Sequence, residues 1–280
     1  MPAGAAAAEI GVIGGSGLST FLDDVTEVTV DTPYGPPSDS VFLGEAGGRR
    51  VAFLPRHGRK HHMPPHRINY RANLWALASL GVRQVLGPCA VGGLRPEYGP
   101  GTLLVPDQLV DRTKARTQTY YDGEPLADGT VPNVVHTAFA DPYCPDGRAA
   151  AVAAARGTGW EPVDGGTLVV VEGPRFSTRA ESRWHAAQGW SVVGMTGHPE
   201  AVLARELGLC YTSLTLVTDL DAGVETGEGV THEEVLRVFA TNVDRLRGVL
   251  LAAVEALPRE RECLCARALD GMDPGIVLPG

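Results

Sequence analysis

Short apolar runs alternate with stretches of helical spacing along most of this chain, and this alternation constrains the fold more than any other feature. Such a pattern predicts an α/β architecture. Several runs end in glycines, prolines and small polar residues, namely Ile10 to Ile13 before Gly14-Gly15-Ser16-Gly17, Val51 to Leu54 before Pro55-Arg56-His57-Gly58, and Thr167 to Val171 before Glu172-Gly173-Pro174-Arg175. Because ligands gather at the carboxyl ends of strands in open α/β sheets, these loops are candidate parts of a site.

Three segments have the spacing and the end signals of helices. They run from Arg71 to Leu80, from Pro199 to Leu207, and from Glu233 to Leu257 with Thr231 as N-cap. No repeat or linker divides the chain. We therefore expect residues 10–280 to form a single domain that follows a disordered, alanine-rich tail over residues 1–9.

The composition narrows the class of protein. The formal net charge of −9 disfavours nucleic acid as a partner, because backbone phosphates need clustered basic surface. No apolar stretch approaches the roughly 20 residues that span a bilayer, and the alanine-rich start lacks the basic residues of a signal peptide. Five cysteines, an odd number, fit a reducing compartment better than a disulfide framework. We expect a cytoplasmic protein without a membrane or nucleic-acid partner.

The sequence offers no pattern of metal ligands. Cys263 and Cys265 form a C-x-C pair with no second pair or matching histidines, which disfavours zinc and leaves a redox role open. His61 and His62 are adjacent and cannot share one helix face as a zinc pair would. We expect neither a metal nor an organic cofactor.

Two carboxylates follow the apolar run from Leu214 to Val217. If that run is a strand, Asp219 and Asp221 point to the same side at its end. Close carboxylates repel each other, and a partly buried one tends to keep its proton. A carboxyl beside a carboxylate suits adenine, whose N7 needs a proton and whose 6-amino group needs an acceptor. A loop with two solvated acids is the alternative for this motif taken alone.

Other loops carry groups that suit phosphate. Gly14 to Gly17 offers backbone N–H groups and a hydroxyl, although it lacks the order of a dinucleotide site or a P-loop. Arg56 and His57 would bring a fixed positive charge and a second donor. Thr196 and Thr218 add hydroxyls. Together with the acid pair, these groups indicate a nucleoside and free phosphate as ligands.

Five motifs in this order resemble the trimeric purine nucleoside phosphorylase superfamily, and within it the methylthioadenosine phosphorylase branch. The resemblance covers about residues 10–257. Its motifs are Gly11-Val12-Ile13-Gly14-Gly15-Ser16-Gly17-Leu18, Arg56-His57-Gly58, Asn69-Tyr70-Arg71-Ala72-Asn73-Leu74-Trp75-Ala76-Leu77, Glu172-Gly173-Pro174-Arg175-Phe176-Ser177 and Met195-Thr196-Gly197.

The resemblance implies a single α/β domain with a mixed, partly barrel-like central sheet flanked by helices. It implies phosphorolysis of methylthioadenosine to adenine and 5-methylthioribose 1-phosphate, with phosphate as a co-substrate and no cofactor. It assigns phosphate contacts to Ser16, Arg56, His57, Ala90, Thr196 and Thr218. Phe176 and Met195 would contact base and ribose, while Asp219 would face N7 and Asp221 the 6-amino group.

The resemblance also implies how the substrate is selected. Relatives that act on 6-oxopurines carry asparagine at the position of Asp219 and glutamate near that of Ser177, so this chain favours 6-aminopurines. Val235 and Leu236 would form an apolar pocket for a 5′-thiomethyl group, or simply pack in the core. His136 matches a residue that reaches a neighbouring subunit's 5′ pocket, which implies a homotrimer or a dimer of trimers.

Three positions depart from the branch, namely Cys89, His198 and His232, and the last would make the 5′ pocket more polar. The 5′ substituent therefore stays open between thiomethyl, halogen and hydroxyl. A 6-oxopurine or broad-specificity purine nucleoside phosphorylase is the main alternative. A nucleosidase that uses water and a non-catalytic nucleoside-binding protein are others. A dinucleotide-dependent dehydrogenase is rejected, because Asp31 does not lie in a convincing βαβ unit.

Overall fold

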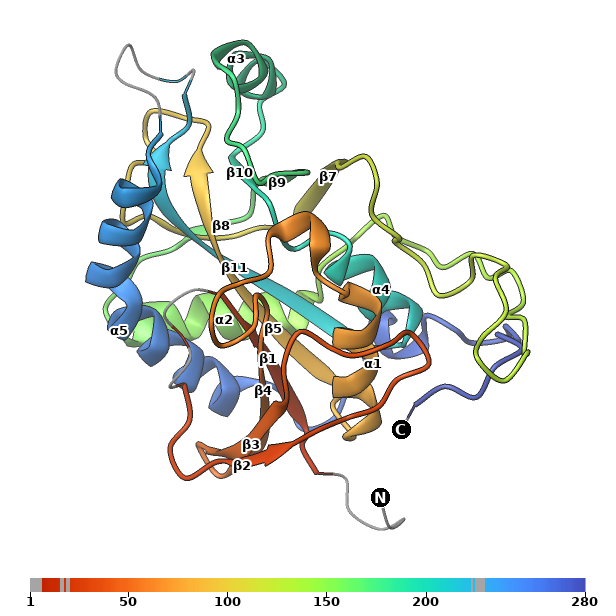
Figure 1. Cartoon of the computed structure of the whole chain (residues 1–280). Coiled ribbons are helices and arrows are strands. Elements are labelled where there is room, and N and C mark those ends of the chain that lie inside the picture. The colour runs from red at the N-terminus through yellow and green to blue at the C-terminus, as the bar shows by residue number, and fades with distance from the viewer. Residues whose placement is uncertain (1–6, 16–17, 19–20, 223, 225–229, 280) are drawn as a thin grey trace.

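The computed structural model describes residues 7–15, 18, 21–222, 224 and 230–279 (Figure 1). Within them, one mixed sheet contains 11 strands. The strands are β1 (Ile10–Gly14), β2 (Thr26–Val28), β3 (Val41–Ala46), β4 (Arg49–Pro55), β5 (Gln84–Gly93), β6 (Leu103–Val105), β7 (Gln108–Arg112), β8 (Val163–Asp164), β9 (Thr167–Val171), β10 (Val192–Gly194) and β11 (Cys210–Leu220). The α-helices are α1 (Tyr70–Ser79), α2 (Pro145–Gly157), α3 (Arg179–Ala187), α4 (Glu200–Glu206) and α5 (His232–Ala256), and short 3-10 helices lie at Pro65–Arg67 and Leu264–Arg267.

The long strand β5 is the centre of the sheet. It pairs in parallel with β1 and with β11, and its last residues pair antiparallel with β10. The sheet order is β2-β3-β4-β1-β5-β10-β9-β7, and β11 branches off β5 toward β6 and β8. The predicted single-domain α/β fold with a mixed sheet flanked by helices is therefore confirmed. The branching brings the carboxyl ends of β5 and β11 beside β10.

Helices cover the sheet on two sides (Figure 1). On one side, α2 and α5 pack together, and Val249 and Leu250 of α5 share a core with Leu214 and Leu216 of β11. On the other side, α1 and α4 share a second core with Tyr211 of β11. Because side chains alternate along a strand, β11 contributes to both cores and is buried over nearly its whole length.

The three expected helices are present as α1, α4 and α5. Their starts follow ordinary capping chemistry: the Asn69 side chain accepts from the N–H of Ala72, and the Thr231 hydroxyl accepts from the N–H of Glu234 at 3.3 Å. The apolar run from Leu214 to Val217 is part of a longer strand, because β11 continues through Leu220. Asp219 therefore lies within the strand.

The predicted tail lies only partly within the described residues, which begin at residue 7. Ala8 is buried, and its N–H donates to the carbonyl of Leu80 at 3.0 Å. Glu9 accepts from the Arg49 guanidinium at 2.8 Å. These two residues belong to the folded unit, which thus begins before residue 10. None of the helices in the described residues is both long and apolar enough to cross a membrane.

Candidate active site

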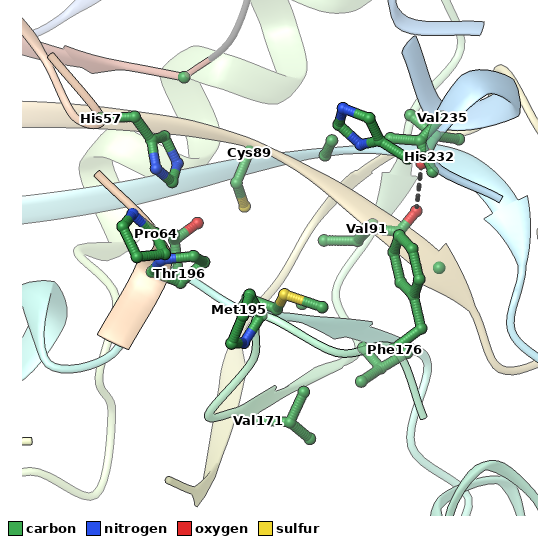
Figure 2. A pocket seen from close by; sticks show the side chains of 18 of the residues that line it. His57, Pro64, Cys89, Val91, Val171, Phe176, Met195, Thr196, His232 and Val235 are labelled. Carbon is green, nitrogen blue, oxygen red and sulfur yellow. Dashed lines mark hydrogen bonds between the residues drawn. The ribbon is translucent and has the colours of Figure 1, made fainter. Parts of the chain in front are cut away.

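A pocket of about 410 Å³ opens where β5, β10 and β11 end, next to the loop that follows β4 and the first turn of α5. In the view of Figure 2, His57, Cys89 and Thr196 lie toward one side of this pocket, and Phe176, His232 and Val235 lie toward the other. The lining also includes Gly15, Arg56, His61, His62, Met63, Pro64, Pro65, Ala90, Val91, Gly92, Val171, Pro174, Ser177, Val193, Gly194, Met195, Thr218, Asp219 and Asp221. Loops that are distant in the sequence thus form one site, as expected from an α/β sheet.

A β-bulge delivers the acidic residues to the pocket. β11 pairs with β5 in regular register up to Val217, opposite Val91, and then resumes with Asp219 opposite Gly92. Thr218 is the extra residue of the bulge. Neighbours in a regular strand point to opposite faces, but here Thr218 and Asp219 both line the pocket, as does Asp221. The prediction that the two carboxylates share one side is confirmed.

The two carboxylates differ in their surroundings. The pKa of Asp219 is raised from its usual 3.8 to about 6, mainly by burial and also by the charge of Asp221, while a hydrogen bond from the Thr218 hydroxyl at 2.8 Å opposes the shift. Asp221 is also buried, and within the described part of the chain its Oδ2 has no hydrogen-bond partner. One carboxyl can therefore carry a proton near neutral pH, and the other presents an open acceptor.

A buried ion pair holds the arginine of the pocket. Nε of Arg56 donates to Oε1 of Glu200, its Nη2 donates to Oε2 at 3.0 Å, and its Nη1 donates to the carbonyl of Pro88 at 2.8 Å. The Tyr211 hydroxyl donates to the same Glu200 carboxylate at 2.6 Å. Arg56 is 1% exposed and Glu200 is fully buried, so the guanidinium is fixed in one place. Sequence reasoning missed Glu200, because it lies 144 residues from its partner and no local pattern connects them.

His57 is held differently from the expectation. Its Nδ1 lies 2.8 Å from the Met63 carbonyl, which can only accept, so this nitrogen carries the hydrogen. Burial lowers the pKa of His57 to about 4, so the ring is neutral at physiological pH. The N–H of His57 that was expected to donate to phosphate is thus already donated to the Met63 carbonyl. What His57 can present to a ligand is the lone pair of Nε2, which suits a protonated phosphate oxygen.

The remaining predicted residues divide into two groups. Ala90, Thr196, Phe176, Met195 and Val235 all line the pocket. Leu236 and His136 do not: Leu236 is 44% exposed on the outer side of α5, and His136 is exposed in the long loop before α2. Ser16 lies outside the described residues. Of the expected apolar pair, Val235 alone therefore lines the pocket of this chain.

Three more histidines line the pocket, and only His232 was expected there. His61 and His62 line it, although their adjacency was used only to exclude zinc, and His232 lines it beside Val235 (Figure 2). Of the other departures, Cys89 lines the pocket with its Sγ 3.8 Å from the Ser213 hydroxyl. His198 is not among the lining residues, and its Nε2 instead lies 3.2 Å from Asp111.

An acid pair, a buried arginine and a mixed α/β sheet are the features expected of a nucleoside phosphorylase. Related proteins agree with this class. The profile of the phosphorylase superfamily matches residues 9–255. A purine nucleoside phosphorylase from Streptomyces coelicolor is 82% identical over 97% of this chain and 98% of its own length. An S-methyl-5'-thioadenosine phosphorylase from Mycolicibacterium smegmatis is 54% identical over 96% and 99% of the two chains.

Solved structures agree as well. A methylthioadenosine phosphorylase from an antarctic soil metagenomic library has a TM-score of 0.86 at 38% identity and covers 95% of this chain and 92% of its own. The Schistosoma mansoni methylthioadenosine phosphorylase in complex with adenine has a TM-score of 0.85 at 38% identity, over 91% and 93% of the two chains. The chain belongs to the phosphorylase superfamily and, within it, to the purine nucleoside and methylthioadenosine phosphorylase family of pentosyltransferases.

Proposed function

We propose that this enzyme cleaves S-methyl-5'-thioadenosine with phosphate to give adenine and 5-methylthioribose 1-phosphate. Inorganic phosphate is the co-substrate, and neither a metal nor an organic cofactor takes part in the reaction. The observation that carries the proposal is the pairing of Asp219, whose pKa is raised to about 6, with the buried Oδ2 of Asp221, which no described residue hydrogen-bonds.

The acid pair selects the purine through its hydrogen-bond pattern. An adenine offers an acceptor at N7 and a donor at its 6-amino group. A protonated Asp219 donates to N7, and Asp221 accepts from the amino group. A 6-oxopurine places a carbonyl oxygen where the amino group stood, so Asp221 would face another acceptor. Because an unmatched buried polar group costs about 1–3 kcal/mol, the pair favours 6-aminopurines.

The same groups account for the chemistry. Cleavage of the glycosidic bond develops positive charge on the ribosyl ring and negative charge on the departing purine. A phosphate near Arg56 and Thr196 stabilises the ring electrostatically and attacks C1′. Asp219 transfers its proton to N7 as the bond breaks, which makes adenine a better leaving group. His57, neutral and with a free Nε2, accepts from a protonated phosphate oxygen.

Two features of the pocket act in opposite directions on the choice of the 5′ group. Val235 provides apolar surface for a thiomethyl group, whereas His61 and His232 make the same part of the pocket more polar. The relative that is 54% identical is named for methylthioadenosine, and the relative that is 82% identical is named a purine nucleoside phosphorylase. A broad-specificity purine nucleoside phosphorylase is therefore the second candidate. Asp219 argues against the 6-oxopurine version of it.

The test compares methylthioadenosine, adenosine and inosine, each with and without added phosphate. Phosphate-dependent release of adenine, fastest from methylthioadenosine, is expected. Asp219→Asn should lower turnover of methylthioadenosine and raise relative turnover of inosine, while Asp244→Asn, on the exposed face of α5, should change neither. Release without phosphate would make the enzyme a hydrolase. A preference of the wild type for inosine would refute the assignment of the acid pair.

We also propose a trimeric assembly, alone or as a dimer of trimers, in a cytoplasmic enzyme. The exposed His136, which does not line the pocket of its own chain, supports this, because it could complete the 5′ end of a neighbouring subunit's site. Native mass spectrometry gives the subunit number. In a trimer that mixes His136→Ala subunits with Asp219→Asn subunits, some sites combine the intact Asp219 of one subunit with the intact His136 of its neighbour. Activity should return at those sites, whereas no restoration would contradict a shared site.

A further inference from the structure

Four of the five cysteines meet in one buried cluster, far from the pocket. Cys144 is the N-cap of α2, Cys210 begins β11, and Cys263 and Cys265 lie in the segment that follows α5. Their sulfur atoms all lie within 4.8 Å of one another, and all four side chains are buried. The cluster lies at the start of β11, whereas the acid pair lies at its end. The reaction therefore makes no use of these thiols.

We propose that this cluster is a structural zinc site in which the four cysteines are the ligands. Tetrahedral coordination with Zn–S bonds of about 2.3 Å places the sulfur atoms about 3.8 Å apart. The distance between Sγ of Cys210 and Sγ of Cys263 is 3.3 Å, and the remaining pairs stay within the 4.8 Å limit, so small rotations of the side chains suffice. Four sulfur ligands favour zinc over hard cations such as magnesium or calcium.

The charges around the cluster fit a metal with four thiolates. Such a centre carries a net charge of about −2, which is costly to bury without cations nearby. Nη2 of Arg205 donates to Sγ of Cys265 at 3.7 Å, and Nη1 of Arg261 donates to Sγ of Cys210 at 3.9 Å. Two guanidinium groups thus balance the centre and orient its ligands, as outer-shell partners commonly do.

The state of the thiols also suits metal binding. All five cysteines are free thiols in this structure, and the 3.3 Å between the sulfur atoms of Cys210 and Cys263 is too long for a disulfide bond. The second pair of thiols has no local sequence pattern, because Cys144 and Cys210 come from separate elements.

Zinc here would fasten the C-terminal segment to the sheet. Cys263 and Cys265 belong to that segment, and Cys144 and Cys210 anchor the other half of the site on α2 and β11. Arg261 strengthens the same junction by donating to the carbonyl of Gly208 at 2.8 Å. The bound zinc would therefore raise the stability of the folded chain.

The experiment measures metal by elemental analysis in the full-length enzyme, purified without chelator. About one zinc per chain is expected for a Cys₄ site. The double variant Cys263→Ser/Cys265→Ser should lose it, and Cys89→Ser, which removes the one cysteine outside the cluster, should keep it. Three outcomes would each overturn the proposal. The reduced wild type could fail to take up added Zn²⁺, its intact mass could show two disulfides, or the elemental analysis could find iron in place of zinc.

A second measurement covers the case in which the double variant does not fold. The wild type, stripped of metal and reloaded with Co²⁺, should show the visible bands of tetrahedral thiolate cobalt and the ultraviolet charge-transfer band from sulfur. The Tm of the stripped enzyme should be lower and should recover when Zn²⁺ is added. A Tm that is unchanged by stripping and reloading, together with absent cobalt bands, would refute a structural zinc site.

Discussion

The raised pKa of Asp219 makes a testable prediction about stability. In the folded enzyme its pKa is about 6 against the usual 3.8, so the folded state holds the proton more tightly than the unfolded chain does. Ionised Asp219 therefore opposes folding. The cost is small below pH 4, grows as the pH rises toward 6, and is complete above it. Each pKa unit corresponds to about 1.4 kcal/mol, so the full cost is about 3 kcal/mol.

Replacing this carboxyl by an amide should remove the cost. Asp219→Asn keeps an oxygen that can accept from the Thr218 hydroxyl, so the local hydrogen bond can survive. We expect the variant to exceed the wild type in free energy of unfolding by about 3 kcal/mol at about pH 8, and by about 0.6 kcal/mol at about pH 4. Activity on methylthioadenosine should fall in the same variant, because N7 loses its proton donor.

The assay is urea unfolding at several pH values, with both proteins at the same subunit concentration so that assembly contributes equally. Asp244→Asn serves as the control, since this exposed carboxyl should give no pH-dependent difference. A difference between wild type and Asp219→Asn that stays constant from pH 4 to pH 8 would refute the reasoning, because the carboxyl would then titrate alike in both states.

Three further predictions concern the surroundings of the pocket. Glu200→Gln leaves the buried charge of Arg56 unpaired and should lower the free energy of unfolding by about 3–5 kcal/mol. Tyr211→Phe removes one hydrogen bond to the Glu200 carboxylate and should lower it by about 1.5–3 kcal/mol. Urea unfolding measures both, and a loss for Glu200→Gln no larger than that for Tyr211→Phe would contradict the ion-pair argument. Val235→Thr exchanges a methyl for a hydroxyl and should lower the preference for methylthioadenosine over adenosine by about 10-fold in kcat/KM. An unchanged ratio of the two kcat/KM values would show that Val235 does not contact the 5′ group. Thr231→Ala removes the N-cap of α5 and should lower the free energy of unfolding by about 1 kcal/mol while raising KM for the nucleoside. A KM equal to that of the wild type would show that the cap does not affect substrate binding.

The main elements of the fold were predictable because their signals are local. Glycines and cap residues mark the ends of α1 and α4, and Thr231 marks the start of α5, so these helices follow from short stretches of sequence. The helices α2 and α3 were not anticipated. The first begins at Pro145 after a long irregular stretch, and its alanine-rich pattern carries little periodicity.

The site was predictable where one short motif determines geometry. The two-residue spacing of Asp219 and Asp221 placed both on one side, since strands have a period of two. Leu236 does not line the pocket of this chain, because the next residue along a helix is rotated by about 100° from Val235. Glu200 could not be inferred, since its pairing with Arg56 depends on how distant segments fold together.

The bulge in β11 gives this enzyme an uncommon sensitivity to the length of one strand. Thr218, Asp219 and Asp221 reach the ligand together only because one extra residue interrupts the pairing with β5. Deleting Thr218 would restore regular pairing without altering either acid, and would remove the Thr218 hydroxyl from the pocket. Changes of strand length, as much as changes of side chain, are therefore a route by which evolution or design could alter what this pocket recognises.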